Sequence, residues 1–383
     1  MQKLSNRLDY FTESVIREMT RVANKYGAVN LSQGFPDFDP PRELIDSLKE
    51  AAEKGPHQYE VTWRSKEFRE KLSKKQEKFM GISINPDENI VVTCGSTEAM
   101  MVAMMSVCNP GDKVIVFSPF YENYTADTIL AGAEPIYVPL VPPEFNFDRE
   151  KLRKAFESRP KALILCNPSN PVGKVFTREE LLYISELAKE YDTFVITDEV
   201  YEHIVFKPNK HTYLSSLPGM FERTVSCSSL SKTYSITGWR LGYIIASKDV
   251  INNCKKVHDF LTVGAAAPLQ KAACAGLSLE ESYYDELNNI YEKKKKLFLN
   301  GLDEIGLKYF EPQGAYYVLV DISEFGWKDD YEFCKWMAKE IGVAAVPGSS
   351  FFKENINNYI RFHFAKKDET LIEAIERLKK LKK

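Results

Sequence analysis

Residues 224–246 read TVSCSSLSKTYSITGWRLGYIIA, and this stretch decides what fold to expect. Its two ends, Thr224–Cys227 and Leu241–Ala246, have the apolar and β-branched composition of strands. Between them a single lysine, Lys232, stands among small hydroxyl residues, and Arg240 follows shortly after it. We therefore expect Lys232 to lie in a loop between two neighbouring strands of one sheet.

Lys232 in such a loop is suited to chemistry rather than to packing. A lysine partly removed from water has a lowered pKa, and a neutral amine can attack a carbonyl. Arg240 can donate two parallel hydrogen bonds to a phosphate, and Ser229 and Ser231 can donate further ones. An aldehyde that carries its own phosphate satisfies both ends of the stretch, and pyridoxal phosphate is such a molecule.

Strand-like and helix-like segments alternate on the N-terminal side of this stretch. We expect strands at Ile90–Thr93, Lys113–Phe117, Pro135–Leu140, Ala162–Cys166 and Phe194–Thr197, and helices at Thr97–Val107 and Arg178–Glu190. This alternation predicts an α/β fold with an open, mainly parallel, doubly wound sheet and helices on both faces. Ligands of such sheets bind at the carboxyl ends of the strands.

The pattern changes after about Tyr283. A long charged helix begins near Asp285, strands are expected at Ala315–Val320 and Tyr359–Phe364, and an amphipathic helix closes the chain. This order predicts a smaller α+β domain, which the N-terminal segment with its helix Ser14–Lys25 is expected to join. We assign residues 42–284 to a large cofactor-binding domain, and residues 1–41 with 285–383 to the small domain.

The composition is that of an ordinary globular protein, with 383 residues of which 44% are hydrophobic and 27% charged. A net charge of −3 gives no reason to expect nucleic acid or an anionic membrane as partner. No apolar run approaches the length of a membrane span, and the start lacks the pattern of a secretory signal. Seven cysteines without CxxC or metal-ligand spacing indicate free thiols, so we expect a cytoplasmic protein without a metal site.

FVITDEVY, residues 194–201, places a carboxylate at the end of an expected buried strand. Asp198 there can pair with a protonated heterocyclic nitrogen and keep it charged, which makes the ring an electron sink. Tyr201 can donate a hydrogen bond on the same side. Taken alone, the pattern is also typical of an aspartate that caps the next turn.

Other strand ends carry further polar or aromatic candidates. The stiff loop NPSNPVG, residues 167–173, can hold Asn170 as a donor to a phenolate oxygen, although by itself it is only a turn. Gly95-Ser96-Thr97 joins a strand to a helix start, where free N–H groups favour an anion or the hydroxyls simply cap the helix. Tyr121 could stack on a flat ring or pack in the core.

Arg361 stands between apolar residues of the strand-like stretch NYIRFHF, residues 358–364. A guanidinium in that setting needs a partner. A substrate carboxylate suits its fork, and a structural salt bridge is the alternative.

The motifs NPxNPxG, TDEVY and SxSK…GxR, in this order along the chain, resemble the class I (fold-type I) pyridoxal-phosphate aminotransferases over nearly the whole chain. GFPDF, residues 34–38, is most similar to the branch of kynurenine, glutamine and methionine aminotransferases, with aspartate aminotransferases close by. The resemblance implies that Lys232 joins the cofactor aldehyde covalently and that Asp198 pairs with its ring nitrogen. The other implied cofactor ligands are Gly95, Ser96, Thr97, Tyr121, Asn170, Tyr201, Ser229 and Arg240.

The same resemblance implies how substrate and partner meet the site. Arg361 would bind the substrate α-carboxylate, with Asn170 and the backbone at Gly34 nearby. Tyr59 is similar to a tyrosine that reaches the phosphate of the neighbouring subunit, so a homodimer is expected. The family usually has glycine where this chain has Arg64. We hypothesise that Arg64 lies near the partner's pocket and influences which substrate side chain is preferred, for example by meeting a second carboxylate, with a surface arginine as the alternative.

The implied activity is transfer of an amino group from an aromatic, methionine- or glutamine-like, or dicarboxylic L-amino acid to a 2-oxo acid such as 2-oxoglutarate. Lys232, Asp198 and Tyr201 would be the catalytic residues. A carbon–sulfur β-lyase with the same site is the nearest alternative, and a non-catalytic sensor of this fold is a rival of another class. The sequence does not fix the side chain of the substrate.

Overall fold

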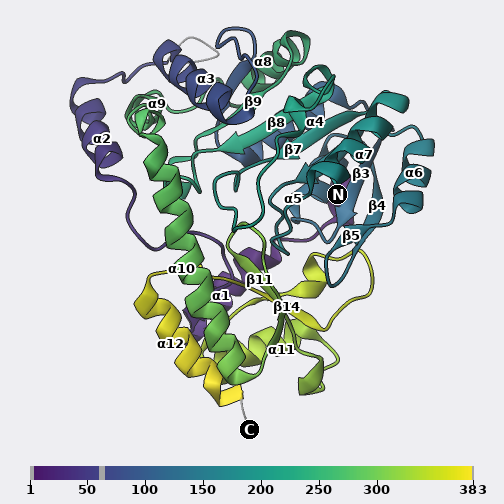
Figure 1. Cartoon of the computed structure of the whole chain (residues 1–383), viewed down its shortest axis with the longest axis vertical. Coiled ribbons are helices and arrows are strands. Elements are labelled where there is room, and N and C mark those ends of the chain that lie inside the picture. The colour runs from purple at the N-terminus through teal and green to yellow at the C-terminus, as the bar shows by residue number, and fades with distance from the viewer. Residues whose placement is uncertain (1–3, 60–64, 382–383) are drawn as a thin grey trace.

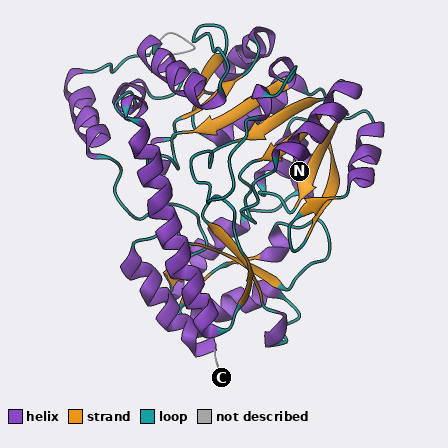
Figure 2. Ribbon diagram, viewed as in Figure 1, coloured by secondary structure: helices purple, strands orange, loops and turns teal. Residues whose placement is uncertain are grey.

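The structure is a computed structural model that describes residues 4–59 and 65–381. Within these ranges the chain forms a large mixed sheet and a smaller antiparallel one, which occupy the upper and lower parts of Figure 1. Helices surround both sheets, as Figure 2 shows. The α/β fold predicted from the alternation of elements is confirmed.

The large sheet has eight strands in the described residues. In order across it they are β2 (Ile90–Thr93), β9 (Gly242–Ile245), β8 (Thr224–Ser229), β7 (Phe194–Asp198), β6 (Ala162–Cys166), β3 (Lys113–Ser118), β4 (Glu134–Val141) and β5 (Asn146–Phe147). The pairs from β8 through β7, β6 and β3 to β4 are parallel. β2, β9 and β5 pair antiparallel at the margins. The centre of the sheet is therefore parallel, as predicted.

The central strands are continuous apolar runs because both faces of the sheet are covered. Leu163 and Val195 face one hydrophobic cluster, whereas Ile164 and Ile196, the next residues along each strand, face the cluster on the other side. The helices that accompany this sheet are α4 (Ser96–Val107), α5 (Asn123–Leu130), α6 (Arg149–Glu157), α7 (Arg178–Glu190) and α8 (Lys248–Thr262). Successive strand residues thus alternate between the two helical layers.

Three further helices pack around the edge of the large sheet that β2 forms. They are α2 (Arg42–Lys54), α3 (Lys66–Met80) and α9 (Ala267–Ala273). Leu44, Phe68 and Ala273 from these helices share one core cluster with Val92 of β2. Packing in this cluster holds α3 against the β2 edge of the large sheet.

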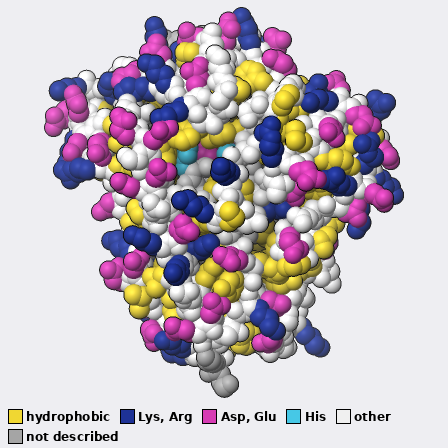
Figure 3. Space-filling model, in the orientation of Figure 1, with side chains coloured by type: hydrophobic (Ala, Val, Ile, Leu, Met, Phe, Trp, Pro, Cys, Tyr) yellow, Lys and Arg dark blue, Asp and Glu magenta, His cyan; other side chains and the backbone are white. Residues whose placement is uncertain are grey.

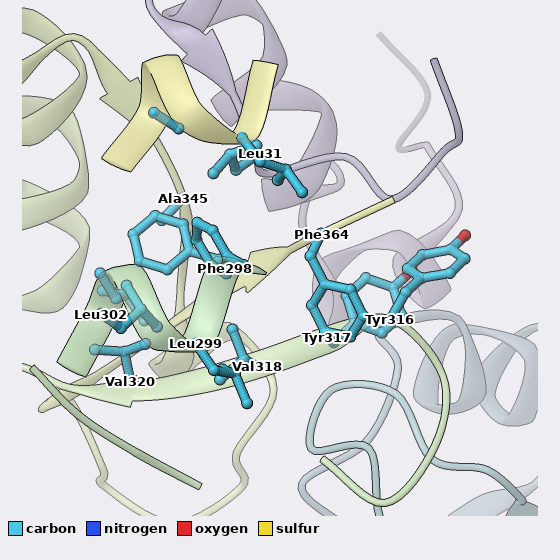
Figure 4. Packing of buried hydrophobic residues seen from close by; sticks show 14 of the residues in the cluster. Leu31, Phe298, Leu299, Leu302, Tyr316, Tyr317, Val318, Val320, Ala345 and Phe364 are labelled. Carbon is cyan, nitrogen blue, oxygen red and sulfur yellow. The ribbon is translucent and has the colours of Figure 1, made fainter. Parts of the chain in front are cut away.

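The small sheet consists of β10 (Lys308–Phe310), β11 (Tyr317–Asp321), β14 (Tyr359–His363) and β13 (Val346–Pro347), all antiparallel. The long helix α10 (Glu281–Ile305) runs from the level of the large sheet down to the small one, where α11 (Asp330–Trp336) and α12 (Asp368–Leu378) also pack (Figure 1). Figure 4 shows Phe298 and Leu302 of α10 packed in one cluster with Val318 and Val320 of β11.

The N-terminal segment packs with the C-terminal part of the chain. Helix α1 (Val15–Tyr26) ends at Gly27, whose φ of 60° is the left-handed conformation that favours glycine at a helix end. Strand β1 (Val29–Asn30) then pairs in parallel with β12 (Val343–Ala344). The irregular segment that contains Gly34 therefore begins after Asn30, the last residue of β1. The assignment of residues 1–41 to a small domain, and the boundary at 284/285, stay predictions.

Helix α11 begins at Asp330, because the Asp329 side chain accepts hydrogen bonds from the backbone N–H groups of Tyr331 and Glu332. The chain continues through a wider helical turn at Met337–Ile341. The short strand β13 follows and pairs with β14.

Three general features bear on function. No helix within the described ranges is long and apolar enough to cross a membrane. All seven cysteines fall in these ranges and are free, and the described residues contain no cluster of metal-ligating side chains. On the face seen in Figure 3, acidic and basic side chains are interspersed rather than separated into large patches.

Candidate active site

A cavity of about 400 Å³ opens where the central strands of the large sheet end. Asp198 is the last residue of β7 and Ser229 the last residue of β8, while Asn170 and Tyr121 follow β6 and β3. The predicted site residues that line this cavity are Gly34, Ser96, Thr97, Tyr121, Asn170, Asp198, Tyr201, Ser229, Lys232, Arg240 and Arg361. Residues far apart in sequence are thus brought together at the predicted edge of the sheet.

Lys232 lies in the loop between β8 and β9, as predicted. Its Nζ donates a hydrogen bond to the Gly34 carbonyl oxygen at 3.2 Å. Burial, together with the charges of Arg240 and Arg361, lowers the pKa of Lys232 to about 8, although the charge of Asp198 acts in the opposite direction. The amine is therefore partly neutral near pH 8.

Asp198 is buried at the end of β7. The Tyr124 hydroxyl donates a 2.7 Å hydrogen bond to Asp198 Oδ2, and the Val200 N–H lies 3.5 Å from Oδ1. Burial raises the pKa of Asp198, while these hydrogen bonds and the charge of Lys232 lower it. A cation placed against this carboxylate would remove the cost of its burial.

The start of α4 faces Arg240. Gly95 precedes the helix with a φ of 85°, and a Cβ at Gly95 would overlap the Arg240 guanidinium. Ser96 and Thr97, the first two helical residues, line the cavity beside Arg240. Since first-turn N–H groups have no partners within the helix, this arrangement is suited to an anion.

Arg361 of β14 is fully buried, with 0% of its surface exposed. Its Nη1 donates to Asn170 Oδ1 at 2.7 Å and its Nη2 to the Ser32 carbonyl at 2.8 Å, while Nε has no partner among the described residues. The guanidinium lies 4.3 Å from the centre of the Tyr317 ring and 4.6 Å from that of Phe351. No carboxylate of the described chain pairs with Arg361, which leaves this buried cation without a counter-charge there.

Tyr201 and Asn170 both line the cavity, and each already has a protein partner. The Tyr201 and Tyr317 hydroxyls are 2.9 Å apart, and Asn170 accepts the hydrogen bond from Arg361. A Cβ at Gly34 would overlap the Tyr317 ring, so this position has room only for glycine. The two tyrosines and the 34–35 backbone form one wall of the cavity.

A buried polar network lies behind the segment that carries Asp198 and Tyr201. Glu202 accepts hydrogen bonds from Lys75 at 3.3 Å, from Tyr213 at 2.6 Å and from Tyr243 at 2.9 Å. Lys75 comes from α3 and also lies 2.8 Å from the His203 Nε2 atom. Burial would raise the pKa of Glu202, but the charge of Lys75 holds it below its usual range. The network therefore connects α3 to the site segment.

Two predicted residues are not brought into the cavity by this chain. Tyr59 is 87% exposed and does not line it, and its predicted role belongs to a neighbouring subunit. Gly95 does not line the cavity either, but its backbone lies so close to Arg240 that a Cβ would overlap the guanidinium. Arg64 lies outside the described residues.

Several residues of the site were missed from the sequence. Tyr124 stands in the same SPFYENY segment as Tyr121, so its place after a strand was a signal that could have been used. Tyr317 gave none, because a tyrosine in a strand is ordinary core composition. Arg17 and Glu122 also line the cavity; Arg17 was predicted only as part of the helix Ser14–Lys25, and Glu122 was not considered beside Tyr121.

The residues present fit pyridoxal phosphate. Lys232 is a buried amine of lowered pKa, Asp198 is a buried carboxylate that needs a positive partner, and the start of α4 with Arg240 forms an anion site. Each feature matches one part of that molecule: its aldehyde, its ring nitrogen and its phosphate.

Comparison with known proteins agrees with this geometry. The family model for aminotransferase class I and II matches residues 26–378. The chain is 35% identical over 385 residues to the probable N-succinyldiaminopimelate aminotransferase DapC of Mycobacterium tuberculosis, covering 97% of each chain. It is 36% identical over 377 residues to the methionine aminotransferase of Escherichia coli, covering 98% of each.

Solved structures show the same relationship. The N-succinyldiaminopimelate aminotransferase structure from Mycobacterium tuberculosis superposes with a TM-score of 0.95 at 36% identity, covering 99% of this chain and all of that one. A match to the family model over most of the chain, together with this cavity, leaves one conclusion. The chain belongs to the class I and II aminotransferases and is a transaminase that depends on pyridoxal phosphate.

Proposed function

We propose that this enzyme moves the amino group of an L-amino acid to a 2-oxo acid such as 2-oxoglutarate in two half-reactions. The amino acid would be aromatic, methionine- or glutamine-like, or dicarboxylic. The observation that carries the proposal is the buried Lys232 amine, which shares one cavity with Asp198 and Arg361. The names of the relatives, which include methionine and kynurenine–oxoglutarate aminotransferases, support this range of substrates.

The cofactor would be held by groups from five strand ends. Ser96, Thr97, Ser229, Arg240 and the backbone at Gly95 would bind the phosphate. Asp198 would face the ring nitrogen, Tyr121 would stack on the ring, and Asn170 with Tyr201 would hold the ring hydroxyl.

The bound cofactor supplies a carbonyl carbon for the amino group and a ring that withdraws electrons from the substrate Cα. Lys232 would take the proton from the substrate Cα and deliver it to the carbon that the cofactor carbonyl supplies, on the other side of the amino nitrogen. A base whose pKa is near the working pH is efficient in such a transfer, and burial gives Lys232 a pKa of about 8. Asp198, held by Tyr124, would keep a positive charge on the ring nitrogen.

Arg361 would fix the α-carboxylate of the substrate. Its position is set by Asn170 and the Ser32 carbonyl, so little ordering is left to do when the substrate binds. Tyr201 and Tyr317 close the same wall and limit access of water.

A carbon–sulfur β-lyase would use the same groups, and one incubation separates the two activities. With a single amino acid and no acceptor, a transaminase releases at most one 2-oxo acid per site and stops. Addition of 2-oxoglutarate should restart it. A lyase would instead release pyruvate continuously from a cysteine conjugate without acceptor, and that result would overturn the proposal.

We also propose a homodimer in the cytoplasm. Tyr10 and Leu261 are exposed hydrophobic residues that line a groove of about 940 Å³, and this groove shares Thr97 and Arg240 with the site. A second copy covering the groove would complete the wall around Arg240. The seven free cysteines support a reducing compartment.

A further inference from the structure

One charge in the cavity has no role in the proposed function. Among the described residues, the cationic side chains that line the cavity are Arg17, Lys232, Arg240 and Arg361. Lys232 is the proposed base, Arg240 would bind the phosphate and Arg361 the α-carboxylate. Arg17 is left over.

Arg17 stands in the first turn of α1. Its backbone N–H lies 3.4 Å from the Ser14 hydroxyl, but its guanidinium makes no hydrogen bond or ion pair with the described residues. Arg17 and Tyr121 both line the cavity. Arg21, one turn further along α1, instead pairs with both oxygens of Glu13 at 2.8 and 3.1 Å.

Glu122, the residue after Tyr121, also lines the cavity, and its carboxylate is already hydrogen-bonded. It accepts hydrogen bonds from the Ser14 hydroxyl and, at 3.2 Å, from the Val15 N–H. A carboxylate at a helix start is stabilised by the free N–H groups there. Glu122 thus fixes α1 against the segment after β3 and forms no ion pair with Arg17.

We propose that Arg17 binds a carboxylate at the end of the substrate side chain, so that the preferred amino acids and 2-oxo acids are dicarboxylic. This rests on the proposed function. Arg17 is an exposed residue at the edge of the cavity, and a guanidinium forms its strongest hydrogen bonds with a carboxylate, through two parallel N–H donors. With Arg361 holding the α-carboxylate, the two arginines would bind the two ends of one dicarboxylic substrate.

The test compares two donors that differ only in this charge. The half-reaction of the enzyme loaded with pyridoxal phosphate is followed by its visible absorbance with glutamate or glutamine, without acceptor. We expect the wild type to favour glutamate at least tenfold in second-order rate constant. R17Q should lower the glutamate rate constant by about 10- to 100-fold, and the glutamine one by a much smaller factor, because a hydrogen bond to a charged group is lost.

Two variants and a binding measurement make the result decisive. R17K keeps the positive charge but cannot donate two parallel hydrogen bonds from one planar group. Its rate constant for glutamate should lie between those of the wild type and R17Q. R21Q, on the same helix but outside the cavity, should keep the wild-type glutamate-to-glutamine ratio. Calorimetry with glutarate and its monoamide, which do not react, should show the same loss of selectivity in R17Q.

A wild type that does not prefer glutamate, or an R17Q variant that slows both donors equally, would overturn the role of Arg17. If the wild type showed no half-reaction with any amino acid, the proposed function would fail. The glutarate comparison would then still decide whether Arg17 binds the second carboxylate.

Discussion

Burial at Lys232 determines when the amine is charged, and this has a consequence that can be measured. The protonated amine cannot attack an aldehyde, so capture of pyridoxal phosphate by cofactor-free enzyme requires the neutral form. With a pKa of about 8, the neutral fraction rises about tenfold per pH unit below pH 8 and is nearly complete above it. Stopped-flow absorbance should show the capture rate levelling off near pH 8.

An ordinary lysine would behave differently. Its capture rate would keep rising toward pH 10, and that profile would contradict the lowered pKa. Lys232→Ala should abolish both the visible absorbance of the bound cofactor and turnover, and it serves as the blank for the titration.

Single functional residues could be predicted from the sequence where a charged side chain stands in a position that packing does not explain. Lys232 among hydroxyl residues, Asp198 after an apolar run and Arg361 inside a strand each needed an explanation beyond packing, and all three line the cavity. Tyr317 did not stand out, because a buried tyrosine is explained by packing until its hydroxyl partner is seen. The missing information was the partner, which only the fold supplies.

At the scale of elements, the junction between β2 and α4 depends on the absence of a side chain at Gly95. Gly95→Ala would place a methyl group on the Arg240 guanidinium, at a φ of 85° that alanine disfavours. We expect the dissociation constant of pyridoxal phosphate to rise at least tenfold, measured by absorbance or fluorescence titration.

Gly27→Ala is the matched control. Gly27 also has a positive φ, of 60°, but a Cβ there meets nothing within 4 Å. This variant should lose about 1 kcal/mol of stability and keep its cofactor affinity. Equal effects of both variants on affinity would mean that backbone strain, not the approach to Arg240, is responsible.

The Lys75–Glu202 pair connects two elements through charge. Lys75→Met would leave Glu202 buried without its cation, and we expect the free energy of unfolding to fall by about 3–5 kcal/mol. The double variant with Glu202→Gln should lose less than Lys75→Met alone, because no uncompensated charge remains. Denaturant unfolding of the cofactor-loaded enzyme measures both.

An exposed pair gives the reference for that experiment. Lys54 and Glu50 lie one turn apart on α2, and Lys54→Met should change the stability by less than about 0.5 kcal/mol. A comparable loss there, or a double variant no better than the single one, would contradict the account of the buried pair.

The bounds of helices and strands were predicted well where the hydrophobic periodicity ends at the same place as a capping or turn residue occurs. Ala162–Cys166 and Arg178–Glu190 have the predicted bounds, since a continuous apolar strand and a helix with a Thr177–Glu180 capping box both end sharply. Two-residue strands such as β1 and β13 were missed, because they exist only through pairing with distant strands. Local sequence carries no record of that pairing.

At the scale of the whole molecule, the predicted dimer makes each site depend on two chains. A mixed dimer of one Lys232→Ala chain and one Tyr59→Ala chain would hold one site with both residues intact if Tyr59 serves its neighbour. Co-expressed and doubly tagged dimers should therefore regain activity that neither parent homodimer has. No recovery would mean that Tyr59 serves its own chain, and an active Tyr59→Ala homodimer would mean that it serves no site.

The parallel pairing of β1 with β12 limits how early in its synthesis the chain can complete its fold. During synthesis on the ribosome, Val29 and Asn30 emerge long before their partners Val343 and Ala344. The hydrogen bond from Arg361 to the Ser32 carbonyl likewise forms only after β14 has been synthesised. A nascent chain halted before residue 343 should hence carry the strands of the large sheet and the groups proposed to hold the cofactor, but no Arg361, so the substrate carboxylate can be bound only when translation is nearly over.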